Sequence, residues 1–100
     1  MILYNVTIGI DREIETEWLS WMKTQHIPEV LSTGIFVSYK FYKVLSHEDD
    51  HTVSYCIQYF TPGIEQFNVY LRDFAPGLVE KHKAKFKDKH VAFRTLLEEI

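Results

Sequence analysis

Apolar residues recur with two different periods along this chain, and the period separates predicted strands from predicted helices. β-Branched and aromatic residues alternate with other residues, as in strands, over residues 2–9, 35–45, 51–60 and from residue 90 onward. Apolar residues lie three and four positions apart, as in helices, over residues 13–26 and in a second stretch from about residue 64. The order βαββαβ predicts one α+β domain over residues 1–100, with a ferredoxin-like fold whose four-stranded antiparallel sheet carries the helices on one face.

Proline interrupts both predicted helices. The ring of Pro28 opposes the carbonyl four residues earlier, so the first helix should end or kink near Ile27 and continue as a short segment over residues 28–32. Asp11 is the expected N-cap of the first helix, and Gly34 is the expected C-terminal stop.

The second half of the chain repeats this pattern. An interruption is expected at residues 75–77, and a shorter helix should follow from Leu78 to about residue 86. Between the two middle strands, the acidic and polar residues 46–50 predict a hairpin loop. A strand, a proline-broken helix and a second strand therefore occur twice, which is the internal pseudo-symmetry expected of a ferredoxin-like fold.

Strict alternation assigns the strand residues to the two faces of the predicted sheet. The face beneath the helices is expected to carry Ile2, Tyr4, Val6, Ile8, Ile35, Val37, Tyr39, Phe41, Val53, Tyr55, Ile57, Tyr59, Val91, Phe93, Thr95 and Leu97. The opposite face is expected to carry Leu3, Asn5, Thr7, Phe36, Ser38, Lys40, Tyr42, Ser54, Cys56, Gln58, Phe60, Ala92, Arg94, Leu96 and Glu98. The second face carries too many apolar side chains to be fully exposed to water and too many polar side chains to form a core without water.

A mixed face of this kind suits the association of two copies through their sheets, because the apolar side chains would be covered and the polar ones could pair. We therefore expect a homodimer. The alternative is a monomer whose second sheet face is solvated, as antiparallel sheets often are.

Composition and charge narrow the class of protein. Hydrophobic residues make up 46% of the chain and charged residues 25%, which indicates a globular domain rather than disorder. The net charge of −3 gives no general attraction to nucleic acid or to anionic membranes, so neither is an expected partner. The single cysteine, Cys56, excludes an intrachain disulfide, and the apolar N-terminal segment lacks the basic start of a signal peptide. We expect a cytoplasmic protein.

Several short motifs are spread over nearly the whole chain. They are Tyr4-Asn5-Val6-Thr7, Trp18-x-x-Trp21-Met22, His26-Ile27-Pro28, Thr33-Gly34-x-Phe36, Gln58-Tyr59-Phe60, Ala75-Pro76 and the run VAFRTLLE from Val91. Together they resemble a family of bacterial proteins of about 100 residues known only as a domain of unknown function. That resemblance implies no activity. More distantly, the element order and the broken helices are similar to the dimeric α+β barrel group, which includes cofactor-free monooxygenases, haem-degrading enzymes, isomerases and cyclases. This similarity implies a homodimer with one small-molecule cavity per subunit.

The first candidate site lies on the helix side of the sheet. Four phenol groups are expected to share that face, from Tyr4, Tyr39, Tyr55 and Tyr59, below the His26 imidazole of the first helix. Histidine moves protons near pH 7, so His26 is the candidate general base and the tyrosines are expected to orient or polarise a substrate oxygen. Trp18, Trp21 and Met22 are expected to contact the ligand. The alternative is a structural histidine bonded to a backbone carbonyl or to one tyrosine.

The second candidate site is Arg94 with Asn5, on the open face of the predicted sheet. An arginine in the middle of a strand needs a carboxylate, a carbonyl cluster, water or a ligand anion, so Arg94 could anchor an acidic substrate. The alternative is a salt bridge at the dimer interface. In this assignment His26 and Arg94 lie on opposite faces and do not share a pocket.

Two other charged segments carry weaker signals. His47 and His51 lie four residues apart among carboxylates, but a hairpin loop gives them no fixed geometry, so no metal site is expected. The lysine-rich run over residues 80–90 is predicted to be a solvated surface.

The sequence thus favours a small-molecule-binding homodimer. As an enzyme it would be an isomerase, cyclase or monooxygenase without a cofactor, acting on an aromatic or oxygenated metabolite. The alternative is a non-enzymatic interaction or stress-related dimer whose polar core residues are structural. An open cavity lined by His26 and tyrosines would favour the first function, and a filled core the second.

Overall fold

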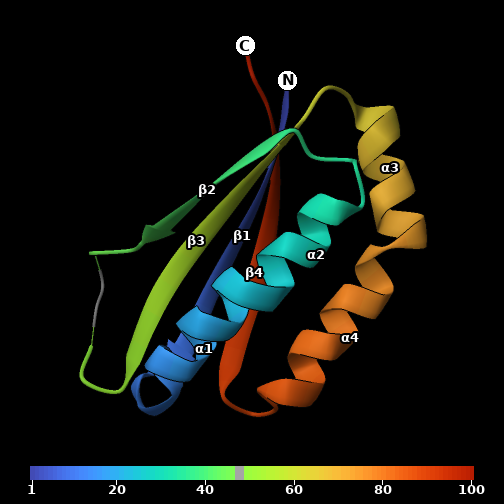
Figure 1. Cartoon of the computed structure of the whole chain (residues 1–100). Coiled ribbons are helices and arrows are strands. Elements are labelled where there is room, and N and C mark those ends of the chain that lie inside the picture. The colour runs from blue at the N-terminus through green and yellow to red at the C-terminus, as the bar shows by residue number, and fades with distance from the viewer. Residues whose placement is uncertain (47–48) are drawn as a thin grey trace.

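Four antiparallel strands form one sheet in the order β2-β3-β1-β4, and the helices cover one of its faces (Figure 1). The computed structural model describes residues 1–46 and 49–100. Its elements are β1 (Ile2–Asp11), α1 (Glu15–Trp21), α2 (Ile27–Ser32), β2 (Ser38–Lys43), β3 (Thr52–Thr61), α3 (Ile64–Asp73), α4 (Ala75–Lys85) and β4 (His90–Glu98). The predicted βαββαβ order and the α+β fold class are confirmed.

The first helical layer does not break at Pro28. A 3-10 turn at Arg12–Ile14 leads into α1, and a π-helical segment at Met22–His26 joins α1 directly to α2. The amide of Ile27 donates to the carbonyl of Met22, five residues earlier. Because the π turn shifts the bonding pattern by one residue, the helical path continues where an ordinary α-helix would meet the proline ring. The predicted kink near Ile27 therefore takes the form of a π segment that ends at His26.

The helix ends agree with the prediction at Gly34 and differ from it at Asp11 and at the start of α4. Gly34 ends the first layer with a φ of 77°, and its amide donates to the carbonyl of Leu31. Asp11 stands before the first helical turn, but its side chain makes no capping hydrogen bond. Helix α4 begins at Ala75, three residues before the predicted start, because Pro76 lies in the first turn, where its missing amide costs no helical bond.

The predicted sheet faces are correct for β1 and β3 and wrong for β4. Residues opposite each other in an antiparallel pair share a face, and Arg94 lies opposite Val6, which is buried under the helices. Ala92, Arg94 and Leu96 therefore lie on the helix side. Val91, Phe93, Thr95 and Leu97 lie on the open face, the reverse of the prediction. Apolar residues occupy both alternating sets in this edge strand, so its hydrophobic pattern does not fix which set faces the core.

The segment before β2 also departs from the predicted alternation. Phe36, predicted for the open face, is only 5% exposed, and its ring lies 5.2 Å from the Tyr59 ring and 4.9 Å from the Tyr70 ring. β2 begins two residues later, at Ser38, so strand alternation does not extend to Phe36. Val37, predicted to lie beneath the helices, is exposed.

We expect opposite effects on stability from alanine at two glycines. Gly34→Ala should lower the free energy of unfolding by about 1 kcal/mol, because a side chain is strained at positive φ. Gly77→Ala should raise it by roughly 0.5–1 kcal/mol, because Gly77 lies within α4, has open space around its Cα and has no positive φ. Urea unfolding measures both effects. Equal effects of the two substitutions would contradict the assigned backbone geometry.

Candidate functional site

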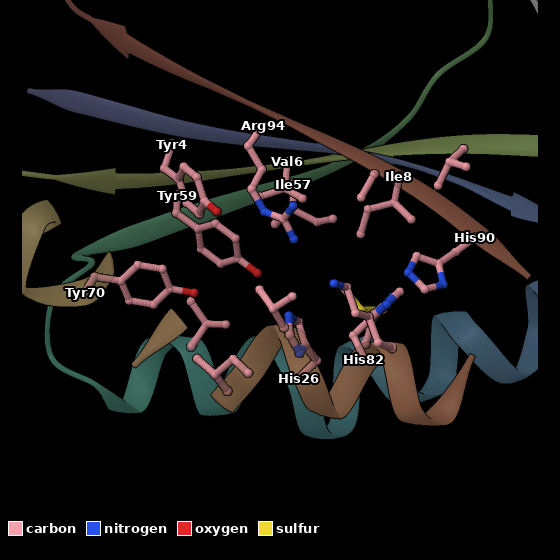
Figure 2. Close-up of a pocket in the computed structure, with 17 residues that line it drawn as sticks. Tyr4, Val6, Ile8, His26, Ile57, Tyr59, Tyr70, His82, His90 and Arg94 are labelled. Atoms are coloured by element: carbon pink, nitrogen blue, oxygen red, sulfur yellow. The ribbon is translucent and has the colours of Figure 1, made fainter. Parts of the chain in front are cut away.

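A cavity of about 280 Å³ lies between the sheet and the helical layer (Figure 2). Its apolar wall comes from Val6, Ile8, Met22, Val30, Ile57, Leu78, Val79 and Ala92. Its polar lining comes from Tyr4, Tyr59, Tyr70, His26, His82, His90, Arg94 and Lys83. Figure 2 shows the phenol groups toward one end, the histidines toward the other, and the Arg94 side chain reaching between them from the sheet. A small apolar cavity with a few convergent polar groups is typical of a ligand site.

His26 is the lining histidine whose ring nitrogens form no hydrogen bond within the described residues. Its imidazole stacks on Trp21, with ring centroids 5.2 Å apart, and lies 5.9 Å from the His82 ring. Within residues 1–46 and 49–100, neither nitrogen takes part in a hydrogen bond. Burial lowers the pKa of His26 to about 4; the negative charge of Glu29 opposes this effect, and the positive charges of Arg94 and Lys81 add to it. The ring is therefore neutral at pH 7 and able to accept a proton.

His82 is held in one tautomer by the core. The indole Nε1 of fully buried Trp18 donates a hydrogen bond of 2.9 Å to His82 Nε2. Indole nitrogen only donates, so Nε2 must carry a lone pair and the hydrogen must reside on Nδ1. Burial, together with the neighbouring His90, His26 and Arg94, lowers the pKa of His82 to about 3. His82 is therefore a neutral hydrogen-bond donor through Nδ1.

His90 has the complementary arrangement. Its Nδ1 lies 2.8 Å from the carbonyl oxygen of Phe86. A carbonyl only accepts, so Nδ1 carries a hydrogen in that contact and Nε2 is left as the second nitrogen of the ring. The His82 and His90 rings meet nearly at right angles with centroids 4.4 Å apart. At the histidine end of the cavity, His82 therefore offers a hydrogen on Nδ1, whereas the Nδ1 hydrogen of His90 is directed to the carbonyl of Phe86.

The phenol end of the cavity offers hydrogen-bond donors. Burial raises the pKa of Tyr59 and of Tyr70 well above the ordinary value, and raises that of Tyr4 less strongly because the charge and hydrogen bonding of Arg94 oppose the rise. All three phenols keep their hydrogens at neutral pH. The rings also pack on one another, with the Tyr4 and Tyr70 centroids 5.9 Å apart, so the hydroxyl positions are set by the core.

The cavity brings together some of the residues singled out from the sequence. His26, Tyr4, Tyr59, Met22 and Arg94 all line it. The prediction that His26 and Arg94 lie on opposite faces is wrong, because the β4 register places Arg94 beside Val6 on the helix side.

The other predicted site residues lie outside the cavity lining. Tyr55 hydrogen-bonds to Glu15, and Tyr39 lies on the edge strand with 43% of its surface exposed. Trp18 and Trp21 stand behind the histidines, where they contact His82 and His26. Asn5 lies on the open face and hydrogen-bonds to Thr7 and Cys56. None of these five residues lines the cavity, and the ligand or proton-transfer contacts expected of them stay predictions.

Four polar lining residues were missed by the sequence reasoning: Tyr70, His82, Lys83 and His90. The available signal for His82 was the four-residue spacing of Leu78, His82 and Phe86, all of which are buried. The prediction of a solvated surface for residues 80–90 is therefore correct for the exposed lysines and wrong for His82 and Phe86.

No group of three or more histidine, cysteine, aspartate or glutamate side chains within the described ranges is arranged to hold a metal ion. Of the loop histidines considered from the sequence, His47 and its neighbour Glu48 lie outside the described residues.

In the part of the chain that is described, no helix combines the length and apolar character needed to cross a bilayer.

Comparison with known proteins identifies a family and a fold. The family described as "Domain of unknown function (DUF4286)" matches residues 1–100. No curated protein matches the sequence. The structure is similar to HapK from Hahella chejuensis, with a TM-score of 0.71, 10% identity, and coverage of 100% of this chain and 93% of HapK.

Two further solved structures have the same arrangement. An ethyl tert-butyl ether d (ethd) family protein from Bacillus halodurans gives a TM-score of 0.69 at 15% identity, covering 100% of both chains. SnoaB, a cofactor-independent oxygenase from Streptomyces nogalater, gives 0.67 at 14% identity, covering 99% of this chain and 93% of SnoaB. At these identities the similarity shows the fold alone, which is that of the dimeric α+β barrel proteins.

The neutral histidines make stability dependent on pH. The folded pKa values of His26 and His82, about 4 and about 3, lie below the unfolded value of roughly 6.5. Below about pH 6.5 the unfolded chain therefore takes up protons that the folded chain does not, and the free energy of unfolding should fall as pH falls toward 4. Each histidine contributes up to about 1.4 kcal/mol per pH unit in that window.

Urea unfolding between pH 7 and pH 4.5 measures this slope. His26→Gln should reduce it, whereas substitution of the exposed loop residue in His51→Gln should leave it as in the wild type. An unchanged slope in His26→Gln would show that His26 is not held neutral by the fold.

Proposed function

We propose, for a chain that belongs to the DUF4286 family, that each subunit of a homodimer binds a small oxygenated or aromatic molecule in its cavity and transfers a proton within it. The observation that carries this proposal is the uncommitted, neutral His26 imidazole in a cavity that also holds three protonated phenols. A proton acceptor at one end and oxygen-directed donors at the other are the groups that enolisation of a carbonyl compound needs.

The proposed reaction begins at a carbon next to a carbonyl group. His26 removes the proton from that carbon, and the electron pair moves to the carbonyl oxygen, giving an enolate. His82 Nδ1–H and the phenols of Tyr4, Tyr59 and Tyr70 are the candidate donors to that oxygen. Return of the proton to another carbon gives an isomerase, and attack of the enolate on a second carbonyl gives a cyclase. A monooxygenase would instead use dioxygen as co-reactant for the carbanion.

Trp18 and Trp21 have positioning roles in this proposal. The Trp18 indole fixes His82 as a donor, and Trp21 holds the plane of His26 by stacking. These contacts also support the core, so substitutions at the tryptophans would change stability together with function. The cavity residues themselves are the better subjects for a test of catalysis.

The rate of hydrogen–deuterium exchange at the carbon next to the carbonyl of 2-tetralone, a bicyclic enolisable ketone, tests the proposed proton transfer. In deuterium oxide near pH 7 the wild-type protein should accelerate this exchange, as followed by NMR. His26→Gln should lower the protein-dependent rate by about 100-fold or more, since general-base contributions are of that order.

His51→Gln is the matched control, because it removes an exposed imidazole outside the cavity, and it should retain the wild-type rate. Exchange that is no faster with the wild-type protein than with buffer, or that is equally fast with His26→Gln, would refute the assignment of His26 as the base.

The homodimer is proposed from the open sheet face. The fold family is typically dimeric. In the single chain, Phe93 is 63% exposed, and Val91 and Leu97 are also exposed on the same face of β4. This apolar set is larger than predicted, because the β4 register directs Phe93 and Leu97 outward. Burial of these side chains against a second copy would be favourable, because it removes exposed apolar surface from water.

Sedimentation at micromolar concentration should give a mass of about twice 11.9 kDa. Phe93→Glu should give the monomer, because it places a charge in the proposed interface. Leu45→Glu introduces the same change at an exposed hairpin position outside that face and should remain dimeric. A wild-type mass of 11.9 kDa would contradict the proposal.

A further inference from the structure

The charged side chains that line the cavity in the described part of the chain are positive. Arg94 and Lys83 line it, and no aspartate or glutamate does so among the residues that the structure describes. The lowered pKa values of His26 and His82 keep both imidazoles neutral at pH 7, and the phenols of Tyr59 and Tyr70 keep their hydrogens. The formal charges on the described lining are therefore those of Arg94 and Lys83, both of which keep solvent exposure, while Glu29 acts on His26 from outside the lining.

The Arg94 guanidinium forms no ion pair within residues 1–46 and 49–100. In the part of the sequence that is described, no salt bridge joins its guanidinium to an acidic side chain, and its register on β4 directs it to the helix side rather than toward a second sheet. Figure 2 shows its side chain extending from the sheet into the space between Tyr59 and the histidines. A guanidinium in this position can offer parallel N–H groups to a bound anion.

The charge of Arg94 acts on both ends of the cavity. It opposes the rise in the pKa of Tyr4 at the phenol end, and it helps to lower the pKa of His26 and of His82 at the other end. A negative group bound between these ends would be attracted by the guanidinium and would accept hydrogen bonds from neighbouring phenols. One guanidinium with neutral donors balances a single negative charge better than the double charge of a phosphate monoester.

We propose that the ligand of this cavity is a planar monoanion, an aromatic or enolisable carboxylic acid whose carboxylate is held by Arg94 and the phenols of Tyr4 and Tyr59. This inference rests on the proposed function and names its substrate class. The carboxylate lies at the phenol end, and the rest of the molecule extends along the apolar wall toward His26. The 280 Å³ volume accommodates a molecule of one or two fused rings.

Calorimetric titration with 2-naphthoate tests the charge requirement on the wild-type protein. 2-Naphthoate should bind at least about tenfold more tightly than 2-naphthalenemethanol, which has the same ring system and a neutral hydroxyl. It should also bind more tightly than 2-naphthyl phosphate. Equal affinity for the alcohol would overturn the proposal, and preference for the phosphate would overturn its restriction to a monoanion.

Variants at Arg94 test which group recognises the charge. Arg94→Gln should weaken 2-naphthoate binding by about tenfold and leave the affinity for the alcohol unchanged, a moderate loss because the arginine keeps some contact with solvent. Arg94→Lys should retain part of the affinity, since it keeps the charge without the planar fork. Lys87→Gln removes the same charge from the exposed turn after α4 and should bind as the wild type does. Loss of binding in Lys87→Gln equal to that in Arg94→Gln would show a non-specific effect of net charge and overturn the assignment.

His26→Gln separates this inference from the proposed proton transfer. The variant should bind 2-naphthoate with the wild-type preference over the alcohol, although it should not catalyse exchange of 2-tetralone. Arg94-dependent binding without any exchange activity would leave the anion site standing and refute the catalytic proposal. Exchange activity without preference for the carboxylate would do the reverse.

Discussion

The hydrogen bond from Trp18 to His82 ties the two helical segments of this protein together at the base of its cavity. It joins α1 to α4. The donor Trp18 and the acceptor His82 lie 64 positions apart in the sequence, and both side chains are buried. An indole N–H left without a partner in the core would carry a desolvation cost of about 1–3 kcal/mol, so the bond favours a fixed separation of the helices. It also leaves His82 with its hydrogen on Nδ1. The same hydrogen bond thus contributes to the packing of α1 against α4 and sets the tautomer of a histidine that lines the cavity.

The register between β1 and β4 has an equally direct consequence for chemistry. Pairing of Val6 with Arg94 sets a positive charge beneath the helices, and the neighbouring Phe93 is turned to the open face. A shift by one residue would exchange those environments, burying phenylalanine in the cavity and leaving the arginine on the open face. The same strand pairing therefore supplies the charge for the proposed ligand site and the apolar surface for the proposed dimer.

The β4 register was not predictable from the sequence, whereas much of the remaining fold was. The element order and the faces of β1 and β3 followed from periodicity, because each strand has one clearly apolar set of positions. β4 has apolar residues in both sets, so its phase depends on pairing with β1, which local spacing does not encode. The continuous helix through Pro28 depended on a π turn, which proline position alone does not predict. For the site, His26, Tyr4 and Tyr59 could be found from their stripes, whereas His82 lay within a lysine-rich run whose exposed residues obscured its buried face.

The charge distribution of the cavity couples the proposed binding step to the proposed chemistry. Burial and the positive charges of Arg94 and Lys81 keep the pKa of His26 near 4, so the empty site contains a proton acceptor that is fully available at pH 7 but weak. A carboxylate paired with Arg94 would offset the part of this lowering that comes from the Arg94 charge and so raise the pKa of His26, while burial, the larger cause, would remain. A neutral ligand of the same shape would leave the imidazole as weak as before. In this arrangement, an anionic ligand does more than occupy the cavity, because its charge strengthens the base that is to act on it.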